Sequence, residues 1–485
     1  MKKILFLLFS AALLAACASD NNPILTIDGG QVQGVKGELK GVYVYKGIPY
    51  AAPPIGQLRW KEPQPVVPWD GVKVCDTFGH PGYQVVHYPG GYTTEWGYGD
   101  EPAYSEDCLY LNVYTKAPGQ TDKKLPVAMW IHGGGLREGW GFEPEFDGEE
   151  FAAKDIVLVT INYRLGMFGF MSHPDLIAED PHGSSGNYGI MDQVQALKWI
   201  KANIAQFGGD PDNVMIFGQS GGGRSTRTLS ESPIARGLFH KAVIMSAQGF
   251  STAPGYSAAT TTLEDQSNMY KEVMDWAGLD DLQKMRAAST EYIFSVVDIY
   301  NRVHGLRAAG MFAPIIDGYV VKQDFDTAAK TGNLANVPYM IGFTLNDNGD
   351  MAPGIKAFCL DREEKGNKAY AYQFARPLPD DGKHPEVTQR LRGAFHSSDL
   401  WFVFKSLKHC WRPWTQGDWD LSEKMITAWS NFAKNSDPGL GWEPCTAAKP
   451  DFMVFRLDEN DAEASFLGQP LKPEQPAQMR NVPRN

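Results

Sequence analysis

The sequence predicts an α/β fold in which a large, mostly parallel twisted sheet is flanked by helices. Short apolar runs typical of buried strands alternate with segments whose apolar residues have helical spacing. This alternation implies parallel strands joined by right-handed crossovers. Two N-terminal runs are typical of antiparallel edge strands, and a later segment is mostly helical. We therefore expect a central parallel sheet, antiparallel N-terminal edge strands and a helical cap insertion.

The predicted strands are short runs rich in apolar side chains. Those of the parallel part cover residues 125–131, 156–162, 214–217, 242–245 and 338–342. A helix is predicted between 189 and 207, because apolar residues recur there with helical spacing. The edge strands are expected at 24–27 and 39–45.

The chain has no clear linker, internal repeat or low-complexity block, which predicts one large domain over residues 24–467. The helical insertion, expected at about 255–310, interrupts the strand rhythm and is predicted to cover the edge of the sheet. Residues 468–485 are rich in Pro and Gln and are expected to form an extended C-terminal tail.

The N-terminus has the pattern of a bacterial export signal. A basic start and a short apolar run end in Leu14-Ala15-Ala16-Cys17, which resembles a lipoprotein processing site. The interpretation is a signal peptide over 1–16, a lipid on Cys17 and a polar tether over 17–23. A plain signal peptide cut at the same place is the alternative. A lipid-anchored protein of the cell envelope, periplasmic or on the outer membrane or cell surface, is therefore expected.

The net charge and the cysteine pattern limit the possible functions further. The formal net charge of −12, without a basic cluster, argues against nucleic-acid binding. Five cysteines follow Cys17, and because five is odd at least one is unpaired. No cysteine or histidine cluster has the spacing of a zinc site, and no cofactor is implied.

A nucleophile is predicted at Ser220, in the sequence Gly218-Gln219-Ser220-Gly221-Gly222. This Gly-x-Ser-x-Gly pattern follows a predicted strand and precedes a segment that can be helical. The turn between them is so tight that larger side chains would collide with neighbouring backbone. The strained turn exposes the serine hydroxyl above the sheet, at the positive end of the helix.

Three glycines follow another strand and predict a site for negative charge. The strand 125–131 runs into His132-Gly133-Gly134-Gly135. Such glycines let backbone N–H groups point at a ligand and stabilise the oxyanion of a tetrahedral intermediate. The predicted oxyanion hole uses the amides of Gly134, Gly135 and Gly221. A flexible turn is the alternative.

Longer motifs give the chain a family resemblance from about residue 29 to 396. The segments that carry it are 45–51, 53–60, 105–112, 186–189, 192–193 and 207–211. With these motifs the chain resembles the type-B carboxylesterase family, which includes cholinesterases. The resemblance implies the α/β-hydrolase fold and hydrolysis of carboxylic esters. The family often has Glu before the serine, where this chain has Gln219.

The resemblance also implies two structural contacts. Cys108 typically bonds the earlier cysteine, here Cys75, and this disulfide would close an aromatic loop that borders the active site. The resemblance gives no partners for Cys359, Cys410 and Cys445. It further implies a salt bridge between Arg59 and Glu106, for which two solvated surface charges are the alternative.

The serine needs a base and an acid, in the chain order Ser, acid, His. His396 lies in a segment that resembles the catalytic histidine motif of the family, and His409 is the alternative. Asp347 falls where the family usually has its acidic residue, and Asp350 is the alternative.

The predicted activity is acyl transfer through an acyl-enzyme. The expected substrate is a small-molecule or polymer-borne ester, and the expected membrane contact is through the lipid anchor alone. A non-catalytic adhesion protein is the alternative from another class, although such relatives lose the serine that this chain retains. An amidase or lactonase with the same residues is an alternative within the enzymes.

Overall fold

The computed structural model describes most of the chain. The described residues are 22–87, 89–98, 101–251, 262–304, 312–457, 465–467 and 470–472. The predicted signal peptide, Cys17 and most of the predicted tail lie outside them. Within the described residues, none of the helices combines the length and the apolarity that crossing a bilayer requires.

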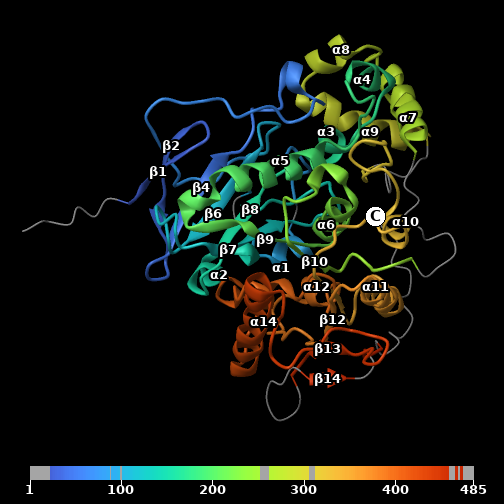
Figure 1. Cartoon of the computed structure of the whole chain (residues 1–485). Coiled ribbons are helices and arrows are strands. Elements are labelled where there is room, and N and C mark those ends of the chain that lie inside the picture. Colours follow the sequence, from blue (N-terminus) through green and yellow to red (C-terminus); the bar gives the residue numbers. More distant parts are fainter. Residues whose placement is uncertain are drawn as a thin grey trace, which may run out of the picture.

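The described strands form one large mixed sheet and one small sheet (Figure 1). In spatial order the large sheet contains β14 (Ser465–Leu467), β13 (Phe452–Phe455), β12 (Ala369–Phe374), β11 (Tyr339–Thr344), β10 (Lys241–Met245), β9 (Gly209–Gln219), β7 (Leu125–Ile131), β8 (Val157–Ile161), β6 (Tyr110–Thr115), β4 (Tyr43–Pro49) and β3 (Val35–Lys36). The small sheet contains β1 (Ile24–Ile27), β2 (Gly30–Gln33) and β5 (Val72–Val74). Strands β7 to β13 pair in parallel, whereas β3, β4 and β6 pair antiparallel at the N-terminal edge. This arrangement confirms the predicted fold class.

Helices cover both faces of the large sheet. The longer ones are α5 (Tyr188–Asn203), α6 (Gly221–Glu231), α7 (Leu263–Trp276), α9 (Thr290–His304), α11 (Ala352–Glu364) and α14 (Gln416–Asn435). The shorter ones are α1 (Tyr92–Glu95), α2 (Glu149–Ala153), α3 (Gly166–Phe170), α4 (Pro174–Glu179), α8 (Leu282–Ala287), α10 (Phe325–Lys330), α12 (Pro385–Thr388) and α13 (Leu400–Val403). Single 3₁₀ turns are η1 (Gly56–Leu58), η2 (Pro144–Phe146), η3 (Ile204–Phe207), η4 (Pro233–Ala235) and η5 (Leu407–His409).

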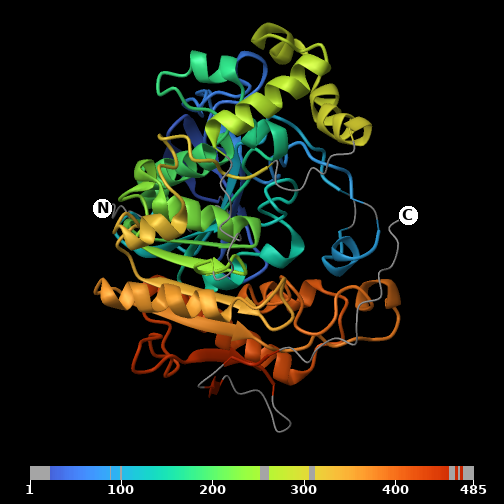
Figure 2. The ribbon, with the colours of Figure 1, turned by 90° about the vertical axis from the view of Figure 1, so that its right-hand side faces the viewer.

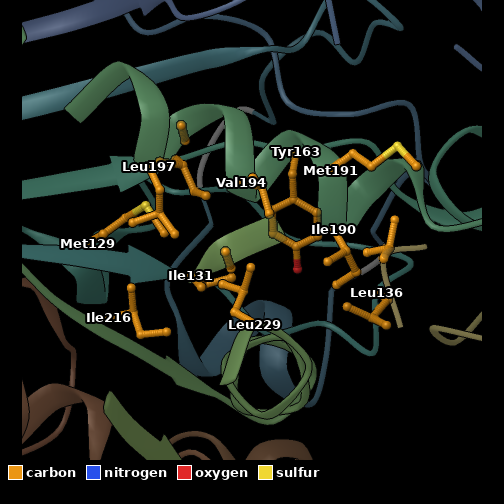
Figure 3. Packing of buried hydrophobic residues seen from close by; sticks show 14 of the residues in the cluster. Met129, Ile131, Leu136, Tyr163, Ile190, Met191, Val194, Leu197, Ile216 and Leu229 are labelled. Atoms are coloured by element: carbon orange, nitrogen blue, oxygen red, sulfur yellow. The ribbon is translucent and has the colours of Figure 1, made fainter. Parts of the chain in front are cut away.

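The alternation of side chains along β7 divides the core into two layers. Met129 and Ile131 belong to one apolar cluster, whereas Ala128 and Trp130 belong to the other. Successive side chains of a strand point to opposite faces, so a central strand must be apolar at every position. Figure 3 shows the first layer, in which Met129 and Ile131 lie with residues of α5 and α6 such as Leu229. The second layer packs against α14 (Figure 1).

The helical insertion is formed by α7, α8 and α9, at one end of the molecule (Figures 1 and 2). Its flanking residues 252–261 and 305–311 lie outside the described residues. Helix α7 packs on α4, and α8 packs on η1. The insertion therefore rests on connecting segments of the fold.

A buried ion pair fixes this insertion to the N-terminal part of the chain. Arg59 Nη2 lies 2.5 Å from Glu106 Oε1, and the side chains are only 6% and 5% exposed. Arg59 Nη1 also donates to the carbonyl oxygens of Met285 at 2.8 Å and Ala288 at 2.9 Å. The hydroxyl of Thr290 donates to Glu106. The predicted salt bridge is confirmed, and it is an internal tie between segments.

The predicted disulfide between Cys75 and Cys108 is not formed, and all five described cysteines, Cys75, Cys108, Cys359, Cys410 and Cys445, are free thiols. Backbone hydrogen bonds hold Cys75 beside β2 and β4, from its N–H to Gln33 O and from Lys46 N–H to its carbonyl. Cys108 is fully enclosed beside the charges of Asp192 and Arg164. The two thiols belong to the same large apolar cluster, but different contacts hold them.

Candidate active site

Ser220 occupies a sharp turn between β9 and α6. Its φ angle is +56°, in the left-handed region that non-glycine residues rarely adopt. The turn is held by a hydrogen bond from Ser220 N–H to Met245 O of 2.9 Å. A strained residue at the end of a central parallel strand is the geometry that the sequence pattern predicts for a nucleophile.

The glycines around Ser220 are required by close backbone contacts. A Cβ atom on Gly222 would collide with the carbonyl oxygen of Ile131 in β7, and one on Gly218 would collide with that of Gly222. A Cβ atom on Gly223 would lie 2.6 Å from Met245 O in β10. Because helix α6 starts this close to two strands, only glycine fits at these positions.

His396 and Asp347 form a direct hydrogen bond. His396 Nδ1 lies 2.6 Å from Asp347 Oδ1, and the aspartate side chain is completely buried. Burial alone would raise the pKa of Asp347. The hydrogen bond and charge of His396, with the N–H of Asn348, outweigh burial and hold this pKa below its usual value. The carboxylate therefore stays ionised and fixes the imidazole with its proton on Nδ1.

The alternatives to these two residues lie elsewhere. Asp350 is exposed and accepts a hydrogen bond from Ala352 N–H at the start of α11. His409 Nε2 lies 3.0 Å from Asp147 Oδ2. The structure thus brings together Asp347 and His396, and neither Asp350 nor His409.

The segments that carry this pair are tied to one another. Asn346 N–H donates to Ala394 O, and Ala394 N–H donates to the Asn346 side chain, both at 2.9 Å. The hydroxyl of Tyr92, from the aromatic loop that the sequence predicts beside the site, donates to His396 O at 2.8 Å. These contacts hold the loop after β11 and the histidine loop in a fixed relation.

The glycine segment after β7 lies against the elbow. Gly134 and Gly135 have φ angles of +83° and +63°, which open the backbone into a tight turn. A Cβ atom on Gly221 would lie 2.9 Å from Gly135 N. Within the described residues, the N–H groups of Gly134 and Gly135 meet no acceptor. Gly221 is the first residue of α6, so its N–H also lacks an intrahelical partner.

His132, just before these glycines, is not a second base. Burial lowers the pKa of His132 to about 3, so the ring is neutral. It stacks on Tyr163 with a centroid distance of 4.4 Å, and the Tyr163 hydroxyl donates to its carbonyl oxygen. His132 therefore packs under the glycine segment.

Sequence reasoning assigned no role to two residues of the site. Gln219 is buried, and its side-chain nitrogen lies 3.3 Å from His396 Nε2. Asp399 is a second buried carboxyl that accepts a hydrogen bond from the Tyr372 hydroxyl at 3.1 Å. Burial, with the charge of Asp347, raises the pKa of Asp399 to about 7. Gln219 precedes the nucleophile and Asp399 follows the histidine by three positions, which is the only sequence signal for either.

Among the described residues, no group of three or more His, Cys, Asp or Glu side chains could hold a metal ion. The arrangement of a strained serine, a histidine–carboxylate pair and open backbone donors can carry out acyl transfer.

Comparison with known proteins places these features in context. The model of the carboxylesterase family matches residues 21–358 and 351–472. The para-nitrobenzyl esterase of Bacillus subtilis (strain 168) is 35% identical over 91% of this chain and 97% of its own length. The fumonisin B1 esterase of Sphingopyxis macrogoltabida is 33% identical over 80% of this chain and 69% of its own length. A solved structure of a PNB esterase matches with a TM-score of 0.74 and 27% identity, over 92% of this chain and 96% of that chain.

Proposed function

This chain belongs to the carboxylesterase family, and from this premise we propose that it hydrolyses esters through Ser220, His396 and Asp347. Ser220 is the proposed nucleophile, His396 the general base and acid, and Asp347 the residue that orients the imidazole. The amides of Gly134, Gly135 and Gly221 form the proposed oxyanion hole.

One observation carries this proposal. The imidazole of His396 is bonded to Asp347 through Nδ1 at 2.6 Å, while Nε2 faces residue 219, the neighbour of Ser220 in the elbow. A proton on Nδ1 leaves a lone pair on Nε2, which faces the Gln219 amide nitrogen in this structure and which we propose accepts the serine proton.

The proposed reaction has two steps. His396 takes the proton of Ser220 Oγ as this oxygen attacks the ester carbonyl, and the amides of the glycines hold the oxyanion. His396 then protonates the leaving alcohol. Water attacks the acyl-enzyme in the same way and releases the acid. Loss of one oxyanion donor typically costs about 3–4 kcal/mol in transition-state energy.

The proposed substrates are small-molecule or polymer-borne esters. The names of these two relatives refer to a nitrobenzyl ester and to fumonisin B1, which are chemically unlike one another. The shared activity is therefore ester hydrolysis, and we assign this chain no single alcohol or acid.

The experiment that tests the proposal is a hydrolysis panel. Purified protein is assayed with p-nitrophenyl esters of increasing acyl length, with aromatic acyl esters and with matched anilides. We expect ester turnover that Ser220→Ala and His396→Ala each reduce by about 10⁴-fold or more, with little turnover of anilides. Ester turnover that persists in Ser220→Ala would refute the proposed nucleophile.

We also propose that export and lipidation at Cys17 anchor the protein to the cell envelope. The support is the Leu-Ala-Ala-Cys sequence after a basic and apolar start. Cells fed a radiolabelled fatty acid should incorporate label into the wild-type protein and not into Cys17→Ser. Equal labelling of both, or no labelling of the wild type, would contradict the anchor.

A further inference from the structure

Two of the cysteines, far apart in the sequence, meet in the C-terminal part of the fold. Cys359 lies in α11, and Cys445 lies in the segment between α14 and β13. Their thiols are within hydrogen-bonding reach of one another. Helix α11 packs beside β12 (Figure 1).

Backbone contacts on both sides of Cys445 fix this meeting independently of the thiols. Cys445 N–H donates to Ala369 O, at the first residue of β12, over 2.9 Å. Ala447 N–H donates to Glu363 Oε2 over 2.7 Å, and Glu363 is one turn of α11 beyond Cys359. The segment around Cys445 therefore lies along the same face of α11 that carries Cys359.

The buried environment of the two cysteines favours a cross-link between them over reactions with molecules at the protein surface. Cys359 is 0% exposed and Cys445 is 1% exposed, and both belong to the same apolar cluster. The hydrogen bond from Cys359 lowers the pKa of Cys445, whereas burial raises that of Cys359.

We propose that Cys359 and Cys445 form a disulfide when the chain meets an oxidant of the disulfide class, such as oxidised glutathione or an oxidoreductase with an active-site disulfide. During folding, while Cys445 is still accessible, its thiolate attacks one sulfur of that disulfide and releases a thiol. Cys359 then loses its proton and attacks the Cys445 sulfur, which releases the second thiol. Two protein thiols lose two electrons and two protons in total, and the oxidant gains them.

This cross-link joins α11 to the segment before β13. It lies near the start of β12, at the opposite end of the parallel strands from the acid loop that follows β11. Helix α11 begins shortly after Asp347, and Cys445 is held against the start of β12, the neighbour of β11. A disulfide that closes a long loop stabilises mainly by restricting the unfolded chain. Among the described cysteines, this pairing leaves Cys75, Cys108 and Cys410 as thiols.

Peptide mapping tests the proposal on the wild-type chain. The protein is refolded with oxidised and reduced glutathione, denatured, alkylated without reduction and cut with trypsin. We expect a peptide pair of residues 357–362 and 435–456 joined by a reducible bond, with Cys75, Cys108 and Cys410 alkylated. Alkylation of both Cys359 and Cys445 without reduction, or a different cysteine pair, would overturn it.

Matched variants test the energetic consequence. Dithiothreitol should lower the Tm of the oxidised wild type by about 3–6 °C and leave Cys359→Ser/Cys445→Ser unchanged. Cys410→Ser is the control and should respond to dithiothreitol like the wild type. A double variant that still responds, or a wild type that does not, would contradict the cross-link. The mapping requires only the wild type, so it decides the matter even if the double variant fails to fold.

Discussion

The imidazole of His396 is held between two side chains of different charge. Asp347 bonds Nδ1 as an ionised carboxylate, and Gln219 contacts Nε2 with a neutral amide. The amide nitrogen of Gln219 is the atom that contacts Nε2, so the side chain donates to the ring and adds no charge to the site. We therefore infer that Gln219 is a positioning residue for the base.

Replacing Gln219 by Glu tests this inference through pH. A carboxylate at that distance favours the imidazolium, which cannot act as a base, so the acid limb of kcat/KM should move to higher pH by about one unit. Gln219→Leu, which adds no charge, should leave the position of the limb close to that of the wild type. An unchanged limb in Gln219→Glu would show that residue 219 does not act on the base.

The two candidate acids are distinguished by their own variants. Asp347→Asn keeps the shape of the side chain but no longer fixes the proton on Nδ1, so kcat should fall by about 10⁴-fold. Asp350→Asn removes an exposed helix-terminal carboxylate and should leave kcat within about two-fold. Steady-state kinetics on one p-nitrophenyl ester compares them. A larger loss in Asp350→Asn would reverse the assignment.

The residues that sequence predicted share a local signature. Ser220 has its glycines on either side, and His396 and Asp347 follow from family motifs and chain order. Gln219 and Asp399 contact residues that are distant in sequence, so no local pattern predicts these contacts. The Cys75–Cys108 disulfide was wrong because the resemblance supplied a pairing that the packing of this chain does not make.

At the scale of elements, the junction between the N-terminal segment and α8–α9 depends on a buried charge pair. Glu106→Gln would leave the Arg59 guanidinium buried with no counter-charge, and such losses cost about 3–5 kcal/mol of unfolding free energy. Asp275→Asn is the control, since its pair with Lys271 is exposed on α7 and its loss should cost less than about 1 kcal/mol. Urea denaturation measures both, and equal costs would contradict the structural role of Glu106.

Strands that form a continuous run of mostly apolar residues were predictable, and others were not. The strand 125–131 matches β7 at both ends. Strand β9 begins at Gly209, before its predicted start, because the polar residues 210–213 hide its first half. Strand β12 was not predicted, because its alternating Ala and Tyr residues do not have the Val and Ile of a typical buried strand. It is nevertheless buried at every position, so tertiary packing overrides local preference there.

At the scale of the whole molecule, the order of the strands in the sheet could not be predicted from the sequence. Periodicity predicts parallel crossovers, but it does not state that β9 lies between β7 and β10 or that β8 lies beside β6. Which strands become neighbours depends on which apolar faces pack together. The order matters for the site, because it brings the glycine segment after β7 next to the elbow after β9.

Stability should depend on pH through the buried carboxyl of Asp399. Its pKa is raised to about 7 in the fold, so between about pH 4 and 7 the folded state binds more protons than the unfolded state. Its contribution therefore weakens stability as pH rises through this window. Asp399→Asn should raise Tm relative to the wild type more at pH 8 than at pH 4.5. A difference in Tm that is the same at both pH values would contradict a buried titrating carboxyl.

The central claim is that Ser220 becomes covalently acylated because His396 removes its proton. Its most direct test is intact mass and peptide mapping after treatment with a p-nitrophenyl phosphonate, which mimics the tetrahedral intermediate. We expect one adduct per chain, located on Ser220, with labelling slowed by at least about 10³-fold in His396→Ala. An adduct on another residue, or a rate of labelling that does not depend on His396, would contradict it.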